Sequence, residues 1–281
     1  MNEKIAALIK TAAIDIADSA GTAAQLEAEI LLAHALGCSR LDLLTHETAP
    51  SLVECNNFQA MINRRVQSEP IAYITGNQPF WDHDFLVSSH TLIPRQDTET
   101  LIEVALRRMP ERGQILDLGT GSGCILLSLL AERPLATGLG LDVSPDTLAL
   151  ARQNARNMQL EERCSFKVSD WYTAVTEKEN HFAAVVANPP YIPSIDVGEL
   201  MADVRNFEPR LSLDGGEDGL ACYRLIIRDA PKFLEGRGLL AVEVGVLQSN
   251  DVALLFEKAG FADIEITRDL PGVERVVSGK K

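Results

Sequence analysis

From residue 114 onward, short apolar segments alternate with helical segments, and this alternation constrains the fold more than any other feature of the chain. Repeats of this kind build sheets whose strands run parallel, with helices on the faces. The expected strands span residues 114–118, 137–143, 164–169, 183–187, 238–244, 263–267 and 273–277. The expected helices span residues 124–132, 145–158, 220–233 and 247–259. We therefore expect an α/β domain with a mostly parallel sheet.

The last two expected strands are separated only by residues 268–272, which are too few to form a helix. Two strands joined by so short a connection pair in the antiparallel sense, because a parallel pair needs a long crossover. A parallel sheet that carries an antiparallel edge is common among α/β domains. We therefore expect a reversed hairpin at one edge of the sheet.

The chain before residue 96 is organised differently. Residues 1–70 carry apolar side chains near helical spacing, which predicts a small bundle of short helices. Residues 70–74 and 80–87 are rich in aromatic and β-branched side chains and predict two strands around a turn. We expect residues 1–70 to form a helical substrate-docking domain, residues 71–95 a β-hairpin linker and residues 96–281 the α/β domain.

Charge and composition exclude several classes of function. The formal net charge is −14 at pH 7, whereas a nucleic-acid binder needs a basic surface against the phosphates, so we expect no direct nucleic-acid partner. An acidic surface would instead steer a basic protein toward it. The apolar runs are too short to span a bilayer, and the N-terminus lacks an export signal. The 5 cysteines have no paired spacing, so we expect a cytoplasmic protein without membrane, disulfide or metal sites.

A glycine-rich segment, Asp117–Gly123 with the sequence DLGTGSG, lies between the first expected strand and helix. Glycines let the chain turn sharply and let a ligand lie against the backbone, while the helix N-terminus supplies N–H donors. The dinucleotide fingerprint requires a glycine where Cys124 stands. The segment instead resembles motif I of class I methyltransferases, whose loop wraps the methionine part of S-adenosylmethionine. The candidate cofactor contacts are Gly119, Thr120, Gly121, Ser122 and Gly123.

Acidic and aromatic residues follow the next two expected strands. Asp142 ends the second strand, where an acid accepts hydrogen bonds from both ribose hydroxyls of a nucleoside. Alone, such an aspartate is more often a helix cap; the glycine-rich segment at this spacing favours the ribose role. Asp170 and Trp171 end the third strand, where the ring could stack on adenine and the acid could reach its amino group. We assign all three residues to the cofactor site.

The tetrapeptide Asn188-Pro189-Pro190-Tyr191 comes directly after the fourth expected strand. Two consecutive prolines fix the backbone and remove two N–H donors, leaving rigid carbonyl acceptors beside the asparagine. The Asn188 side-chain oxygen and the Pro189 carbonyl would each accept one hydrogen bond from a planar amino group, and Tyr191 would pack on its flat face. We assign Asn188, Pro189 and Tyr191 to catalysis, all four residues to substrate binding, and Asn188 also to the cofactor.

This arrangement predicts an N-methyltransferase that acts on a conjugated amino group. The lone pair of such a nitrogen is delocalised, so hydrogen bonds at both protons would help it rehybridise and hold it in line with a sulfonium methyl. No strong general base is obviously required. The tetrapeptide after motif I resembles that of amino-methyltransferases that act on adenine, on guanine in RNA, or on protein glutamine.

Three longer segments narrow the choice of substrate. They are Glu69–Trp81, Leu92–Glu99 and Phe207–Gly219, with the sequences EPIAYITGNQPFW, LIPRQDTE and FEPRLSLDGGEDG. Together with the motifs above they resemble the peptide chain release factor glutamine methyltransferases (the HemK/PrmC family). The resemblance covers nearly the whole chain. It implies a Rossmann-like class I methyltransferase domain preceded by a small helical domain.

The resemblance also implies a reaction and its partners. The enzyme would transfer a methyl group from S-adenosylmethionine, leaving S-adenosylhomocysteine, to the glutamine amide of the Gly-Gly-Gln motif in release factors 1 and 2. The alternative is an adenine or guanine N-methyltransferase acting on RNA or DNA. We expect a monomer. Arg95 and Glu99 would brace the cofactor site or the hinge between domains, although a purely structural ion pair explains them equally well.

Overall fold

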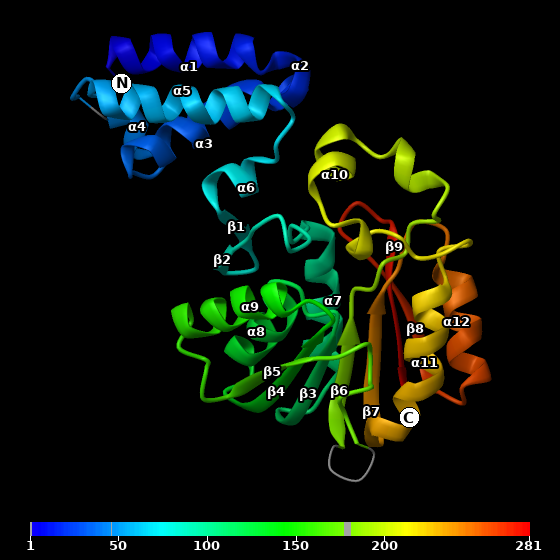
Figure 1. Cartoon of the computed structure of the whole chain (residues 1–281). Coiled ribbons are helices and arrows are strands. Elements are labelled where there is room, and N and C mark those ends of the chain that lie inside the picture. Colours follow the sequence, from blue (N-terminus) through cyan, green and yellow to red (C-terminus); the bar gives the residue numbers. More distant parts are fainter. Residues whose placement is uncertain (1, 46, 177–180) are drawn as a thin grey trace. The chain divides into compact units, whose positions relative to one another are not determined.

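The computed structural model describes residues 2–45, 47–176 and 181–281. The chain divides into two compact units, coloured along the sequence in Figure 1. The first contains Met1–Asn77 together with Met201–Phe207, and the second contains Gln78–Leu200 and Glu208–Lys281. Within the described ranges, no helix is both long and apolar enough to cross a membrane.

The first unit is helical. Its helices are α1 (Glu3–Asp15), α2 (Ala17–Ala20), α3 (Ala24–Leu36), α4 (Asp42–Thr45), α5 (Leu52–Val66), α6 (Ile71–Thr75) and α10 (Ala202–Phe207), with the 3-10 turn η1 (Gly21–Ala23). Apolar side chains of α1, α3 and α5 form its core, among them Ile5, Leu31 and Ile62. Ser51 and Glu54 close a capping box at the start of α5.

The region that begins at Pro70 differs from the expectation. The strand predicted at residues 70–74 is wrong, because residues Ile71–Thr75 form the short helix α6. Ala72, Tyr73 and Ile74 are all buried, which a strand with one solvated face does not achieve for three consecutive side chains. Gly76 then ends the helix in the left-handed conformation, with φ 74°.

A β-hairpin begins directly after this helix. Strands β1 (Asn77–Phe80) and β2 (His83–Leu86) form a separate two-stranded sheet. Phe80 and Phe85 pack edge to face with ring centroids 6.1 Å apart, and both are fully buried. The hairpin is tied to the α/β core because the Asn154 side chain bonds both the N–H and the C=O of Leu86, at 2.9 and 3.0 Å.

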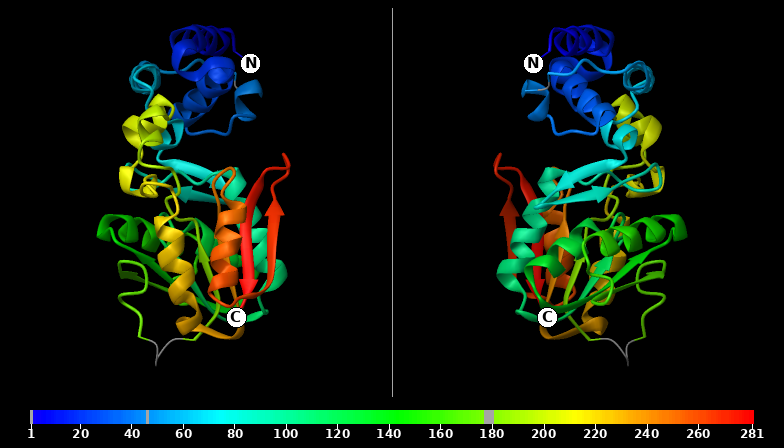
Figure 2. Two further views of the ribbon diagram at one scale, coloured as in Figure 1. Left: turned by 90° about the vertical axis from the view of Figure 1, so that its right-hand side faces the viewer. Right: turned by 90° about the vertical axis from the view of Figure 1, so that its left-hand side faces the viewer.

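The second unit contains the predicted sheet. Its strand order is β5-β4-β3-β6-β7-β9-β8. Strand β9 runs antiparallel to both β7 and β8, and the other neighbouring pairs are parallel, which confirms the mostly parallel sheet with a reversed edge hairpin. The strands are β3 (Arg112–Leu118), β4 (Leu135–Asp142), β5 (Cys164–Val168), β6 (Phe182–Ala187), β7 (Leu234–Glu243), β8 (Ala262–Arg268) and β9 (Glu274–Lys280). The edge pair β8–β9 is the orange and red pair of arrows in Figure 2.

Helices cover both faces of this sheet. One core cluster joins the sheet to α7 (Glu99–Arg108), α8 (Cys124–Glu132) and α9 (Pro145–Asn157). The other joins it to α11 (Ala221–Phe233) and α12 (Ser249–Lys258). The remaining turns are η2 (Gln96–Thr98), η3 (Asp196–Glu199) and η4 (Arg210–Ser212). In register, Leu118 pairs with both Leu141 and Ala187, so β3, β4 and β6 end together at one edge.

Candidate active site

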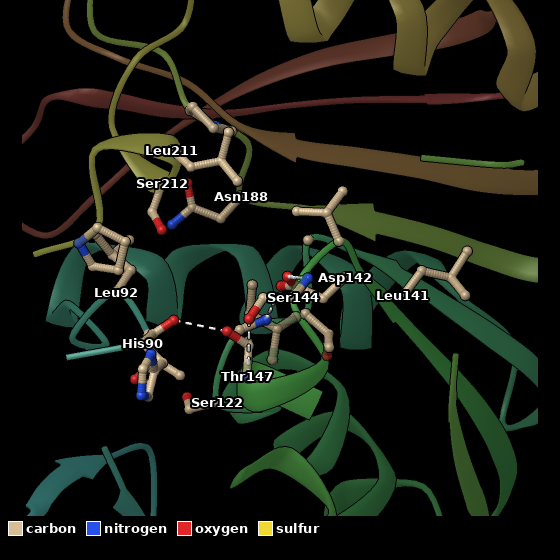
Figure 3. A pocket seen from close by; sticks show the side chains of 18 of the residues that line it. His90, Leu92, Ser122, Leu141, Asp142, Ser144, Thr147, Asn188, Leu211 and Ser212 are labelled. Carbon is tan, nitrogen blue, oxygen red and sulfur yellow. Dashed lines mark hydrogen bonds between the residues drawn. The ribbon is translucent and has the colours of Figure 1, made fainter. Parts of the chain in front are cut away.

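A cavity of about 450 Å³ lies in the second unit, at the carboxyl ends of the parallel strands. Open α/β sheets bind ligands at this edge. Figure 3 shows side chains from several loops around it, with Asn188 and Ser212 on one side and Ser122 and Thr147 on the other. The predicted site residues that line it are Gly119, Thr120, Gly121, Ser122, Asp142, Asp170, Trp171, Asn188 and Pro190. Gly123, Pro189 and Tyr191 do not line it.

The glycine-rich loop after β3 depends on left-handed backbone. Gly119, Gly121 and Gly123 have φ of 69°, 57° and 84°. Residues other than glycine are strained in this backbone conformation, because their Cβ atom lies too close to the following carbonyl oxygen. The loop is also tied to the next strand, because the Thr120 N–H donates to the Leu141 carbonyl at 2.9 Å. Gly123 is the N-cap residue of α8, which explains why it supports the loop without facing the cavity.

We expect Gly121→Ala to weaken the loop. A Cβ at residue 121 meets open space, with the nearest atom the Gly119 carbonyl oxygen at 3.9 Å, so the cost is backbone strain and not a clash. That strain is about 1–3 kcal/mol, and it should lower both the thermal midpoint and the affinity for the cofactor. Calorimetric titration and thermal unfolding would measure the two effects. Alanine at Gly198, which has an ordinary φ and equally open space, is the matched control.

Asp142 is held rigidly at the end of β4. One carboxylate oxygen accepts the Gly121 N–H at 3.1 Å and the other accepts the Ser144 N–H at 3.0 Å. Each oxygen keeps a lone pair that can accept a further hydrogen bond. Burial raises the pKa of Asp142, and these backbone donors oppose the rise. The carboxylate is therefore oriented before any ligand arrives.

Asp117 plays a structural part beneath the loop. Its side chain is fully buried, and the Thr120 hydroxyl donates to one of its oxygens at 2.6 Å. Burial raises the pKa of Asp117 from 3.8 to about 7, and the Thr120 hydrogen bond opposes the rise. This carboxyl couples the end of β3 to the loop.

Trp171 lies beside the glycine-rich loop, just beyond the carboxyl end of β5 and at the same edge of the sheet. Its backbone is left-handed, with φ 48°, and its ring packs partly into the core of the sheet. A Cβ added to Gly119 would lie 4.0 Å from the Trp171 ring, so a side chain there would fill space between them. Asp170 beside it is exposed and lines the same cavity. A flat aromatic or heterocyclic group suits this part of the cavity.

Asn188 has a defined side-chain orientation. Its Nδ2 donates to the Thr98 hydroxyl at 3.2 Å, which leaves its Oδ1 as an acceptor. Tyr191 is fixed at two points, because its carbonyl accepts from Gln248 Nε2 at 2.9 Å and its hydroxyl donates to Glu243 at 3.4 Å. Burial, and secondarily the charge of Glu243, raise the pKa of Tyr191, so its hydroxyl keeps its proton.

Comparison with known proteins identifies the family. Residues 7–76 match the PrmC N-terminal domain, and residues 94–203 match the methyltransferase small domain. The release factor glutamine methyltransferase of Rhodospirillum rubrum is 44% identical over 257 residues, which cover 91% of this chain and 78% of the relative. That of Geobacter sulfurreducens is 41% identical (92% and 89% covered), and that of Escherichia coli 40% identical (90% and 91% covered). The chain belongs to the release factor glutamine methyltransferase family.

The fold agrees with this family assignment. A solved methyltransferase from Pyrococcus furiosus superposes with a TM-score of 0.51 and 16% identity, over 80% of this chain and 98% of that one. The second unit is therefore a class I methyltransferase domain, as expected. Methyltransferases of this class use S-adenosylmethionine, and the cavity fits it chemically. The glycine-rich loop leaves backbone exposed for the methionine part, Asp142 offers acceptors for hydroxyls, and Trp171 offers an aromatic face.

Several cavity residues were missed by the sequence analysis. Between the hairpin and α7, the segment 89–95 contributes most of its residues to the wall of the cavity, and the Thr147 hydroxyl donates to the His90 carbonyl at 2.7 Å (Figure 3). The segment 209–214 supplies Leu211 and Ser212. Residues 92–95 and 209–214 lie inside stretches that carry the family resemblance, which was the available signal for them, whereas residues 89–91 lie outside these stretches. Cys222 of α11 also lines the cavity, and no motif pointed to it.

The structure separates the roles of Arg95 and Glu99. Arg95 lines the cavity and forms an ion pair with the buried carboxylate of Glu208, which also accepts the Ile93 N–H at 3.3 Å. A charged pair thus joins the segment 89–95 to Glu208, the residue that directly precedes the segment 209–214. Glu99 does not line the cavity; it accepts the Trp81 N–H at 2.9 Å and so anchors the turn of the β-hairpin.

The two buried carboxyls near the site predict a pH dependence of stability. Burial raises the pKa of Asp117 from 3.8, and that of Glu243 from 4.5, to about 7. A carboxyl whose pKa is higher in the folded state favours folding most when it is protonated, so this contribution is lost as pH rises through 7. Chemical denaturation should show a stability that falls as pH rises from the unfolded-state pKa values, 3.8 and 4.5, to about 7 and then levels off, because both carboxyls are ionised in the folded and the unfolded state above that pH. In the double variant Asp117→Asn/Glu243→Gln the free energy of unfolding should fall less steeply with pH. An equal fall in the variant and the wild type would contradict the assignment of the pH dependence to these two carboxyls.

Proposed function

We propose that this chain transfers a methyl group from S-adenosylmethionine to the side-chain amide nitrogen of the glutamine in the Gly-Gly-Gln motif of release factors 1 and 2. Its relatives are release factor glutamine methyltransferases, and this supplies the class of substrate. The observation that supports it most strongly is the Asn188 side chain at the cavity wall, whose Nδ2 is engaged by Thr98 and whose Oδ1 is left as an acceptor. An amide –NH2 group offers two donors and needs such acceptors.

The chain's own groups would bind and orient the substrate amide. Asn188 Oδ1, at the cavity wall, would accept one amide proton. The Pro189 carbonyl, which does not line the cavity in this structure, would accept the other, while Pro190 keeps the segment rigid. Tyr191, which also lies outside the cavity wall and is held by Gln248 and Glu243, would pack against the flat face of the amide. The two acceptors stabilise the positive charge that develops on the nitrogen as its lone pair leaves conjugation. Catalysis then rests on alignment. The nitrogen loses one proton once the methyl group has been transferred, and this proton can pass to water, so no strong general base is required.

The cofactor site is proposed from the same geometry. S-adenosylmethionine supplies an electrophilic methyl group on a sulfonium centre. We assign Gly119, Thr120, Gly121, Ser122 and Gly123 to its methionine end. Gly123 would contribute by supporting the loop and not by direct contact. We assign Asp142 to the ribose hydroxyls. Asp170 and Trp171 would hold the adenine, and Asn188 would touch both ligands. S-adenosylhomocysteine is the product.

The remaining features concern the protein partner. We propose that the helical domain, residues 1–70, docks the release factor. Residues 71–95 would link this domain to the methyltransferase domain, residues 96–281. We also propose that the enzyme acts as a cytoplasmic monomer. The net charge of −14 supports a protein partner with basic surface and disfavours nucleic acid. Added salt should therefore weaken the binding of a release factor that presents a basic surface to this protein.

A comparison of methyl transfer to two kinds of substrate tests this proposal. The enzyme is incubated with methyl-labelled S-adenosylmethionine and either a purified release factor or total RNA. We expect label in the release factor and none in the RNA. Efficient labelling of RNA or DNA with no labelling of the release factor would overturn the proposal in favour of an adenine or guanine N-methyltransferase.

A further inference from the structure

A single side chain joins the loop after β6 to the loop after β7. Gln248 is the N-cap residue of α12, and its Nε2 donates to the Tyr191 carbonyl at 2.9 Å. Its Oε1 accepts the Gly245 N–H at 3.1 Å. A carbonyl requires a donor and a backbone N–H requires an acceptor, so these two partners fix the orientation of the Gln248 carboxamide. The side chain therefore forms a bridge between the two loops, with both of its polar ends engaged.

Two glycines enclose this bridge. Gly219 and Gly245 are both buried. A Cβ added to Gly219 would overlap the Tyr191 carbonyl oxygen and would lie 2.5 Å from Gln248 Nε2. A Cβ added to Gly245 would lie 2.7 Å from Gln248 Oε1 and 3.0 Å from Tyr191 Cδ2. The chain thus carries glycine at two positions where any side chain would push the bridge apart.

The bridge supplies what the two prolines of the tetrapeptide leave open. A proline ring fixes φ but not ψ, so it restricts the backbone without setting the direction of its own carbonyl group. That direction also depends on how the chain is held where it leaves the tetrapeptide. There Gln248 holds the Tyr191 carbonyl, and the next residue, Ile192, exchanges two backbone hydrogen bonds with the segment 213–215, at 3.0 and 2.8 Å. The exit of the tetrapeptide is therefore fixed from two sides.

We propose that Gln248 is a positioning residue for methyl transfer, which orients the tetrapeptide 188–191 by holding the Tyr191 carbonyl. This role depends on the proposed function, because it requires that the tetrapeptide holds the substrate amide. Gln248 is not among the described residues that line the cavity, so it acts through Tyr191 and not on a ligand. Without the bridge, the peptide plane after Tyr191 can turn, and the Pro189 carbonyl loses its alignment with the amide. A misplacement of about 1 Å can lower a rate by about 10²-fold.

Removal of the donor tests this role. In Gln248→Met, which keeps the length of the side chain but has no N–H, we expect kcat for release factor methylation to fall about 10–10²-fold. KM for the release factor and Kd for S-adenosylhomocysteine should stay nearly unchanged, because the helical domain and the glycine-rich loop are not altered. Steady-state kinetics and calorimetric titration measure these quantities. Gln153→Met is the matched control and should keep wild-type kinetics, because Gln153 is exposed on α9.

Gly219→Ala reaches the same carbonyl from the other side. Its Cβ would displace the Tyr191 oxygen, so kcat should again fall about 10–10²-fold. Gly260→Ala is the control for backbone strain, because Gly260 has a left-handed φ of 84°, close to the 73° of Gly219, and open space around its Cβ. In the double variant Gln248→Met/Gly219→Ala, kcat should fall much less than the product of the two single losses, because both substitutions act on one carbonyl.

The possible results distinguish a failure of this role from a failure of the proposed function. If the wild-type enzyme labels glutamine but Gln248→Met keeps its kcat, or loses only thermal stability, the positioning role is overturned and the function stands. Equal falls in kcat and in cofactor affinity, or fully multiplicative losses in the double variant, would also overturn the positioning role. Gln248→Met leaves every glycine in place, so its result decides even where Gly219→Ala folds poorly. If the wild-type enzyme does not label glutamine at all, the proposed function itself fails.

Discussion

Replacing Asn188 by alanine is expected to lower kcat for methyl transfer by roughly 10²–10³-fold. The substitution removes the side-chain acceptor that would hold one amide proton, while Asp142 and the glycine-rich loop stay in place for the cofactor. Cofactor Kd should therefore change far less than kcat. Single-turnover rates with a purified release factor, combined with calorimetric titration of S-adenosylhomocysteine, measure the two effects separately.

A matched control keeps this result interpretable. Asn157 is exposed at the end of α9, so Asn157→Ala should leave both quantities unchanged. If Asn188→Ala keeps wild-type kcat, Asn188 does not hold the substrate amide. If its cofactor affinity falls as much as its rate, Asn188 belongs to the cofactor site alone.

The second large effect is expected from Asp142→Ala, which should weaken S-adenosylhomocysteine binding by about 10²-fold or more. Hydrogen bonds to a charged group contribute about 1.5–3 kcal/mol each, and two hydroxyls would lose their acceptor. The N–H groups of Gly121 and Ser144 would also lose the oxygens that order the loop. Calorimetric titration checks the prediction. Asp146→Ala, an exposed acid in the first turn of α9, is the control, and equal affinities of the two variants would contradict the ribose role.

Local patterns accounted for most of the fold. The boundaries of α8 were predicted residue for residue, because a glycine before Cys124 and an arginine after Glu132 bound a continuous apolar run. The segment 70–74 was mispredicted because Ile71, Tyr73 and Ile74 favour strands by intrinsic preference, whereas burial of consecutive side chains in a helical unit decided the outcome.

Local sequence patterns also predicted part of the cavity, but not the contacts between residues that are distant in the sequence. Asp142 and Asn188 could be predicted because Asp142 ends one apolar strand and Asn188 directly follows another, and parallel strands bring their ends together. Thr98 could not, since it is separated from Asn188 by 90 positions, and the two side chains meet only after the loop that follows β6 has packed against the start of α7. Long-range packing, which no local pattern shows, brings these two residues together.

The measurement that tests the central claim most directly is the location of the transferred methyl group. The release factor is methylated in vitro, digested, and its Gly-Gly-Gln peptide fragmented in a mass spectrometer. We predict one additional methyl group on the glutamine side chain, and none when that glutamine is replaced by alanine. A methyl group on any other residue, or an unmodified peptide beside labelled RNA, would contradict the account.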